Sequence, residues 1–168
     1  MRKVKTRKQI TFIVNKLKKQ HKIIVSTNGS FDLLHAGHVR FLEEAKAQGD
    51  VLIIGLNSDK SVRAWKKHIG YKDWKKRPLV PQEYRAEMLA ALECVDYVTI
   101  FDEADCIRFV ESVKPAVHVN GSEYGENCIE APTVKKFGGK IHIVKLHGGL
   151  STSELIKRII DAYSASCK

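Results

Sequence analysis

Apolar positions along the chain follow two patterns that alternate. Short continuous apolar runs are typical of strands buried on both faces of a parallel sheet, whereas apolar residues three or four positions apart are typical of amphipathic helices. The runs predict strands at 23–27, 51–56, 97–101, 116–119 and 141–144. The helical spacing predicts helices at 37–48, 81–93, 105–113, 133–137 and 152–163.

A further amphipathic helix is predicted within residues 1–21, before the first strand. Thr6 and Gln9 have the spacing of a capping box, which marks a helix start. We expect this helix to pack against the rest of the chain through the apolar residues that follow at helical spacing, Ile10, Ile13, Val14 and Leu17.

Strands that alternate with helices predict an α/β fold with a central parallel sheet and helices on both faces, which makes three layers. In such folds ligands bind at the carboxyl ends of the strands. The 168 residues are about the size of one ordinary domain, so we expect a single domain over 1–168.

One segment breaks the alternation. Residues 61–81 are basic, contain Gly70 and two prolines, and are longer than a tight turn between a strand and a helix requires. We therefore expect an irregular, mobile basic flap at 61–81.

Composition places the chain among globular proteins. Hydrophobic residues make up 43% and charged residues 29%, and no apolar run approaches the roughly 20 residues that cross a bilayer. The basic N-terminus is interrupted by lysines and lacks a secretory pattern, so we expect a cytoplasmic protein with no membrane partner. No CxxC pair occurs, which predicts reduced thiols at Cys94, Cys106, Cys128 and Cys167 rather than a zinc site or disulfides.

The formal net charge of +10 has two interpretations. Lysines mixed with Trp65 and Trp74 are compatible with binding of single-stranded nucleic acid. A basic field also concentrates small anionic substrates. We favour the second interpretation, with no nucleic-acid partner, and we expect most of the remaining lysines to be solvated.

The segment 28–38 carries the clearest chemistry. It joins a predicted strand to a predicted helix, so backbone N–H groups and the positive end of the helix dipole converge at one point, where a phosphate binds. The spacing places His35 and His38 one turn apart on one helix face, and Gly37 permits a close approach of ligand to backbone. Two imidazole rings can then contact one phosphate.

Three further clusters are candidates. Glycines at 148–149 lead into three hydroxyl residues at 151–153 before the last helix, which is more than a helix cap requires and predicts a second phosphate contact. Residues 120–124 follow a predicted strand at the same sheet edge. Asn57 and Asp59 follow another strand, and Arg85 lies in the helix after the flap.

The histidine segment resembles the HxGH signature of the nucleotidyltransferase superfamily, in the longer form GxFDxxHxGH of its cytidylyltransferase-like branch. The residues that match are Gly29, Phe31, Asp32, His35, Gly37 and His38. From about Lys22 to Ile160 the chain looks like the heptose 1-phosphate adenylyltransferase family, the adenylyltransferase half of ADP-heptose synthase. Residues 57–59, 77–78, 95–98 and 151–152 also match in order, whereas Ser122 and Glu123 depart from the family's usual turn.

This resemblance implies a Rossmann-like fold and transfer of AMP from ATP to a heptose 1-phosphate, with Mg²⁺ held mainly by the phosphates and a homo-oligomeric assembly. The implied catalytic residues are His35 and His38, with a lysine of the flap, Lys66 or Lys67. The implied nucleotide-binding residues are Asn28, Gly29, Ser30, Phe31, His35, His38, Gly121, Glu123, Ser151, Thr152 and Ser153, and the acceptor-binding residues are Asp32, Asn57, Asp59 and Arg85.

Two alternatives stay open. Glycerol-3-phosphate cytidylyltransferase, which uses CTP, shares the signature but usually carries an arginine shortly before the late serine/threonine motif, where this chain has no arginine over 145–149. A non-catalytic nucleotide-binding module would use the same basic surface, but it would not need both histidines at that spacing.

Overall fold

The computed structural model describes residues 2–145 and 151–164. Its centre is a five-stranded sheet in the order β3-β2-β1-β4-β5, and every pairing in it is parallel. This confirms the predicted parallel sheet. The strands are β1 (Ile24–Gly29), β2 (Val51–Asn57), β3 (Tyr97–Phe101), β4 (Val117–Gly121) and β5 (Lys140–Val144).

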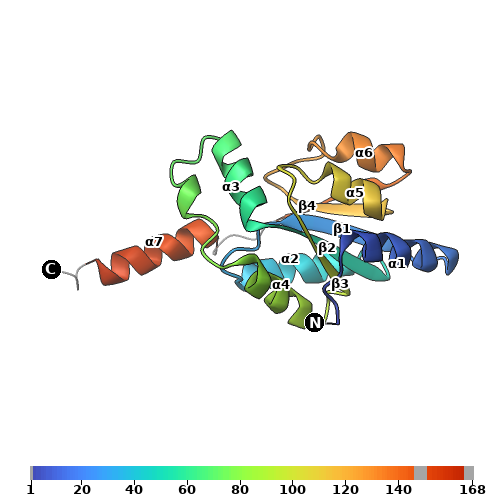
Figure 1. Cartoon of the computed structure of the whole chain (residues 1–168), viewed down its shortest axis with the longest axis horizontal. Helices are drawn as coiled ribbons and strands as arrows, with labels where there is room; N and C mark the ends of the chain where they lie inside the picture. Colours follow the sequence, from blue (N-terminus) through green and yellow to red (C-terminus); the bar gives the residue numbers. More distant parts are fainter. Residues whose placement is uncertain (1, 146–150, 165–168) are drawn as a thin grey trace.

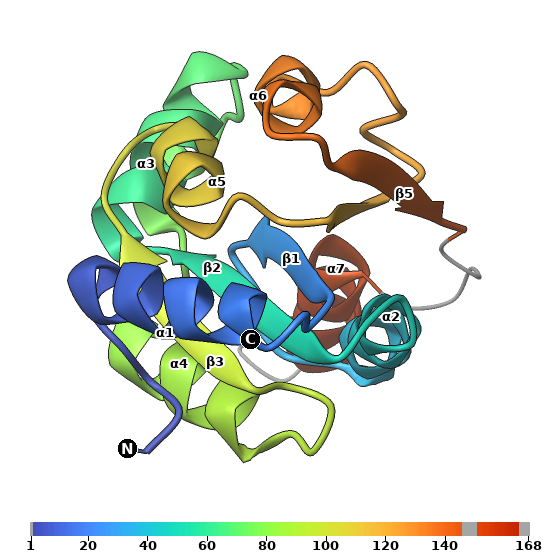
Figure 2. The ribbon, with the colours of Figure 1, turned by 90° about the vertical axis from the view of Figure 1, so that its right-hand side faces the viewer.

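Helices cover both faces of this sheet (Figure 2). Alternate residues of each strand point to opposite faces, so Leu52 and Ile54 join one core while Val51 and Ile53 join the other. The first core packs against α2 (Ala36–Lys46) and α4 (Gln82–Ala91), and the second against α1 (Arg7–Lys19), α5 (Ile107–Val113) and α6 (Ala131–Lys136). The predicted three-layer arrangement is therefore confirmed.

Helix α1 begins as its sequence predicts. The Thr6 hydroxyl accepts a hydrogen bond from the Gln9 main-chain N–H, and the Gln9 side chain accepts one from the Thr6 N–H, which completes the capping box. Ile10 and Val14 are buried in the second core, so the helix packs as expected.

The prediction of an irregular segment over 61–81 is wrong for its first part. Residues Asp59–His68 form helix α3, and Trp74–Lys76 form a short 3₁₀ helix, η1. Ser58 caps α3, because its hydroxyl accepts a hydrogen bond of 3.1 Å from the Ser61 N–H, and Val62 is buried. The helix was missed because only its inner face is apolar, and the lysines on its other faces gave the segment the composition of a loop.

The strand order reverses between β1 and β4, which is where open α/β sheets bind their ligands. The pairing of β1 with β2 continues to Gly29, but its pairing with β4 ends at Ser26 and His118. The carboxyl ends of β1 and β4 therefore separate, and this gap opens the sheet at the edge that the sequence predicted for ligand binding.

Helix α7 (Thr152–Tyr163) has no buried residue and extends away from the sheet (Figure 1). Apolar side chains on it are exposed, namely Ile159, Ile160 and Tyr163. Within the described residues, no helix has the length and hydropathy to cross a membrane.

Candidate active site

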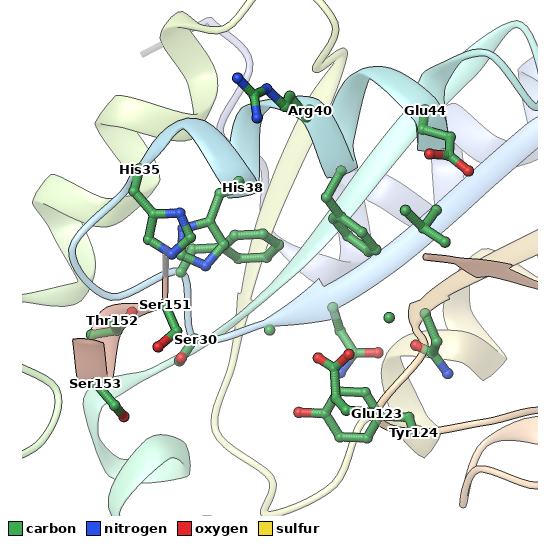
Figure 3. A pocket seen from close by; sticks show the side chains of 18 of the residues that line it. Ser30, His35, His38, Arg40, Glu44, Glu123, Tyr124, Ser151, Thr152 and Ser153 are labelled. Carbon is green, nitrogen blue, oxygen red and sulfur yellow. The ribbon is translucent and has the colours of Figure 1, made fainter. Parts of the chain in front are cut away.

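A cleft of about 420 Å³ lies at the separated ends of β1 and β4. The segment after β1, the first turns of α2, the residues after β4 and the start of α7 form its walls, and Figure 3 shows most of the side chains that line it. All eleven residues predicted to bind the nucleotide line this one cleft: Asn28, Gly29, Ser30, Phe31, His35, His38, Gly121, Glu123, Ser151, Thr152 and Ser153.

The two histidines meet, but not as neighbours on one helix face. His35 has extended backbone angles and is the N-cap of α2, whereas His38 lies in the first turn. Their rings stack with centroids 3.9 Å apart and planes inclined by 24°, on the side of the cleft where Ser151 lies (Figure 3). The His35 side chain makes no capping hydrogen bond, so it leaves the first N–H groups of α2 available to an anion.

Both histidines are neutral at pH 7 in this site. Burial lowers the pKa of His35, and burial together with the adjacent His35 lowers the pKa of His38 to about 4, although Asp32 opposes this. The Nδ1 atoms of both rings and the Oδ1 atom of Asn28 are buried without a hydrogen-bond partner among the described residues. Because unpaired buried polar atoms are costly, these three atoms mark where a polar ligand would bind.

The turn before α2 has an unusual backbone. Phe31 and Leu33 both have left-handed φ angles, 44° and 47°, which non-glycine residues seldom adopt. Asp32 between them is held by its carboxylate, which accepts 2.7 Å from the Arg77 Nε and 3.0 Å from the Leu79 N–H. Asp32 was expected to contact the acceptor, but its side chain is fully buried and does not line the cleft.

Arg85 and Asp59 are likewise absent from the cleft lining. The Arg85 side chain is fully buried and donates to the main-chain oxygens of Ser30 and Asn57, at 2.5 and 2.9 Å, and to the Asp59 carboxylate at 2.6 Å. It thereby joins the ends of β1 and β2 beneath the site. Of the four residues expected to bind the acceptor, Asn57 alone lines a cavity, a second one described below.

The structure separates the two candidate lysines. Lys66 lines the cleft, and its pKa is lowered by burial and by Arg77, with Asp32 opposing. Lys67 is exposed, does not line the cleft, and places its Nζ 5.5 Å from the centre of the Trp74 ring. Only Lys66 is therefore positioned to reach a ligand.

The start of α7 is attached to the histidine turn. The Thr152 hydroxyl donates a hydrogen bond of 2.6 Å to the Asp32 main-chain oxygen, and Ser151 caps the helix by accepting 3.1 Å from the Glu154 N–H. The predicted glycines Gly148 and Gly149 lie outside the described residues.

Several lining residues were not predicted as site residues. Arg40 lies three residues after Gly37 on α2 and Glu44 four residues after Arg40, and this helical spacing was a usable signal. Arg77 matched the family's pattern at 77–78 but was not predicted to line the cleft, because its position there depends on the contact with Asp32. Within the described residues, no three His, Cys, Asp or Glu side chains cluster closely enough to hold a metal ion.

Comparison with known proteins agrees with this geometry. A family model described as cytidylyltransferase-like matches residues 26–158, which include the histidine turn and the start of α7. The chain belongs to the cytidylyltransferase-like family. This membership confirms the superfamily that the HxGH signature indicated, and it makes the chain a nucleotidyltransferase by family.

Relatives of this family member include the bifunctional protein HldE of Geobacter metallireducens and of Geobacter sulfurreducens, 45% and 43% identical over 96% of the chain. The chain spans about a third of the length of these curated relatives, 32% in each case. These matches agree with the resemblance drawn from the sequence.

Two solved structures have the same fold. A lipopolysaccharide core biosynthesis protein from Thermoplasma volcanium is 27% identical with a TM-score of 0.56, covering 77% of this chain and 99% of that one. A pantoate-beta-alanine ligase from Francisella tularensis superposes with a TM-score of 0.59 over 94% of this chain and 77% of its own, but at 16% identity the likeness concerns the fold alone.

Proposed function

We propose that the protein transfers AMP from ATP to a heptose 1-phosphate, giving ADP-heptose and pyrophosphate, for lipopolysaccharide or other surface-glycan precursors. The observation that carries the proposal is the stacked pair His35 and His38 at the start of α2, which shares one cleft with the hydroxyl residues at the start of α7. The sequence resemblance to heptose 1-phosphate adenylyltransferases supports heptose as the sugar, and the bifunctional proteins HldE at 45% and 43% identity match over the same length of chain.

In this reaction an oxygen of the sugar 1-phosphate attacks the α-phosphorus of ATP, and the bond from that phosphorus to the bridging oxygen of pyrophosphate breaks. The acceptor is already an anion at neutral pH, so the site needs no strong base. Catalysis then depends on in-line positioning and on stabilising the charge that develops on the leaving group.

The triphosphate would lie against the first N–H groups of α2, with ring nitrogens of His35 and His38 on one side and the hydroxyls of Ser151 and Ser153 nearby. These groups come from two parts of the chain that the Thr152–Asp32 hydrogen bond holds together. Because they are fixed before the ligand binds, little reorganisation is needed when charge moves to the pyrophosphate.

Lys66 would act between the two substrates, because it lines both the cleft and the adjacent cavity. Its ammonium group can contact the α-phosphate and the incoming phosphate together, which offsets the repulsion between two anions. The expected role of a flap lysine therefore falls on Lys66 rather than Lys67.

Magnesium would enter with the triphosphate. The described residues offer no cluster of metal ligands, and Glu123 and Glu44 are the carboxylates among the cleft-lining residues. Phosphate oxygens and water therefore suit the ion as its main ligands, in keeping with the hydration that Mg²⁺ usually retains. When bound, Mg²⁺ supplies positive charge to the departing pyrophosphate.

We also propose that the protein forms a homo-oligomer and is located in the cytoplasm. Helix α7 supplies hydroxyl residues to the cleft yet exposes Ile159, Ile160 and Tyr163. A 12-residue helix is only marginally stable by itself in water, so burial of this face against a second copy would stabilise the site. Sedimentation at several concentrations of the purified chain tests this assembly.

The test of the activity is pyrophosphate release with ATP or CTP, each combined with heptose 1-phosphate, glycerol 3-phosphate or phosphoethanolamine. We expect the highest kcat/KM for ATP with heptose 1-phosphate. A preference for CTP with glycerol 3-phosphate would instead identify a glycerol-3-phosphate cytidylyltransferase. If no combination of substrates releases pyrophosphate, the remaining interpretation is a non-catalytic nucleotide-binding module.

A further inference from the structure

A second cavity of about 270 Å³ adjoins the cleft. The two share the wall formed by Asn28, Gly29 and Ser30 at the end of β1, and Lys66 lines both. The second cavity extends between α3 and the segment that joins β4 to α6. A substrate that occupies it would therefore meet a nucleotide in the cleft at Lys66.

The far wall of this cavity is apolar and aromatic. It contains Trp65 in α3, Ile69 directly after α3 and Ile129 from the facing segment, and Tyr124 of that segment lines both this cavity and the cleft. Ile69, Tyr124 and Ile129 are 54%, 57% and 54% exposed, so large apolar side chains surround an open cavity. Walls of this kind with a few fixed polar groups are typical of small-molecule sites, and aromatic rings suit the C–H faces of a sugar.

The fixed polar group is Glu130. It is only 5% exposed yet lines the cavity, and its Oε1 accepts a hydrogen bond of 2.6 Å from the Asn120 amide. The Nε2 atom of the fully buried His118 lies 3.4 Å from the same oxygen, while the Nδ1 atom of that ring is 2.7 Å from the Ser26 hydroxyl. The Asn120 amide thus holds one oxygen of the carboxylate, with the His118 ring beside it but not hydrogen-bonded to it, and the remaining lone pairs of the carboxylate, next to the Cys128 thiol, can accept from a ligand.

Glu130 carries its charge at neutral pH. Burial alone would raise its pKa, but the contacts with His118 and Asn120 outweigh this effect and hold the pKa at about 2. An ionised carboxylate only accepts hydrogen bonds, so it binds hydroxyl groups and repels phosphate. Asp105 adds a second carboxylate to the same cavity.

The two ends of the cavity therefore carry opposite charges, with the ammonium group of Lys66 at one end and the carboxylate of Glu130 at the other. We propose that it binds the polyhydroxylated body of the acceptor sugar phosphate, with sugar hydroxyls donating to Glu130 and the phosphate next to Lys66. This inference rests on the proposed function and adds to it the subsite and the residue that select a polyol.

The kinetic test uses Glu130→Gln, which keeps the shape of the side chain and removes its charge. We expect the KM for heptose 1-phosphate to rise about tenfold or more, because hydrogen bonds to charged groups are among the stronger ones, while the KM for ATP changes less than twofold. Glu111→Gln on the exposed face of α5 is the matched control and should change neither constant. An unchanged KM for the sugar, or equal rises in both constants, would overturn the inference.

A binding test separates this inference from the proposed function. In a Trp74→Phe variant, Trp65 is the only tryptophan left, since the chain has two. Titration with heptose 1-phosphate alone should change its fluorescence with saturation, and Glu130→Gln in this background should weaken that binding about tenfold. If the Glu130→Gln chain does not fold, as judged by its thermal unfolding, Asp105→Asn replaces it in both tests, with an expected rise of several-fold.

The two readouts distinguish the possible failures. ADP-heptose formation without a Trp65 signal and without an effect of Glu130→Gln would overturn the cavity assignment and leave the proposed function standing. Saturable binding that depends on Glu130, without product formation, would support the polyol cavity and overturn the proposed function. Absence of both product and binding would overturn both.

Discussion

The Thr152 hydroxyl donates a hydrogen bond of 2.6 Å to the main-chain oxygen of Asp32, a residue 120 positions earlier in the chain. It joins the start of α7 to the strained turn before α2. The two phosphate-binding segments predicted from the sequence thus form one unit, and the precision of the site depends on a contact that neither segment makes alone.

Thr152→Val should test this link. The substitution keeps the shape of the side chain and leaves the Asp32 oxygen unpaired, so we expect kcat/KM for ATP to fall about three- to tenfold, the scale of one neutral hydrogen bond. Thr11→Val is the control, because the Thr11 hydroxyl bonds to the Arg7 oxygen within its own exposed helix turn. Equal effects of the two variants would show that the link to α7 is irrelevant to nucleotide binding.

His38→Ala should lower kcat by about a hundredfold or more while the fold is retained, because it removes a contact that strengthens as pyrophosphate leaves. Initial rates and a circular dichroism spectrum measure the two effects. His21→Asn changes an exposed histidine at the end of α1 and should leave the rate unchanged. A folded His38→Ala protein with the parent rate would remove His38 from the catalytic residues.

Lys66→Met and Lys67→Met form a matched pair of neighbours. Methionine keeps most of the side-chain stem and removes the charge, so the Lys66 variant should lose more in kcat than it gains in KM. The Lys67 variant should behave like the parent, since that side chain lies against Trp74 outside the cleft. The reverse result would mean that the last turn of α3 rearranges when substrates bind.

Binding of ATP should take up protons. The pKa of His38 is about 4 in the free site, and the pKa of His35 is also lowered, so both rings begin neutral. Bound phosphates raise these pKa values, so binding should strengthen as pH falls from 8 toward 5. Calorimetry at pH 6 in two buffers of different ionisation enthalpy measures the uptake. His38→Asn should reduce the uptake, and this comparison cancels the protonation of ATP itself.

Arg85→Met should lower the free energy of unfolding by about 3 kcal/mol or more, because it leaves the Asp59 carboxylate and several main-chain oxygens without their buried partner. Urea unfolding measures this effect. Arg108→Met is the control, since the Arg108 side chain is 74% exposed. A variant of parental stability with a raised KM for the sugar phosphate would instead return Arg85 to the acceptor-binding residues.

The parts of this protein that sequence predicted well depend on local pattern. The apolar runs predicted the five strands, the capping box predicted α1, and the HxGH spacing predicted two histidines that line one cleft. Each of these signals is contained in a few consecutive residues. Local rules of periodicity and capping are sufficient for such features.

The parts that sequence missed depend on contacts between distant residues. Asp32 and Arg85 have the residue types of ligand-binding groups, but Arg77, Leu79 and main-chain oxygens from other elements occupy their polar atoms. Helix α3 was not predicted because its lysines gave the segment the composition of a loop. Glu130, just before α6, gave no signal because the residues that fix its carboxylate, Asn120 and His118, lie on β4.

The early end of the pairing between β1 and β4 has a consequence for how the molecule recognises a substrate. Beyond Ser26 and His118, each of these central strands has main-chain donors and acceptors that face the gap rather than the other strand. They resemble the groups at the outer border of a sheet, but helices on both faces keep them away from strands of other molecules (Figure 2). A small ligand can reach these main-chain groups where another strand cannot. Its own polar atoms would then make the hydrogen bonds that β1 and β4 do not make with each other.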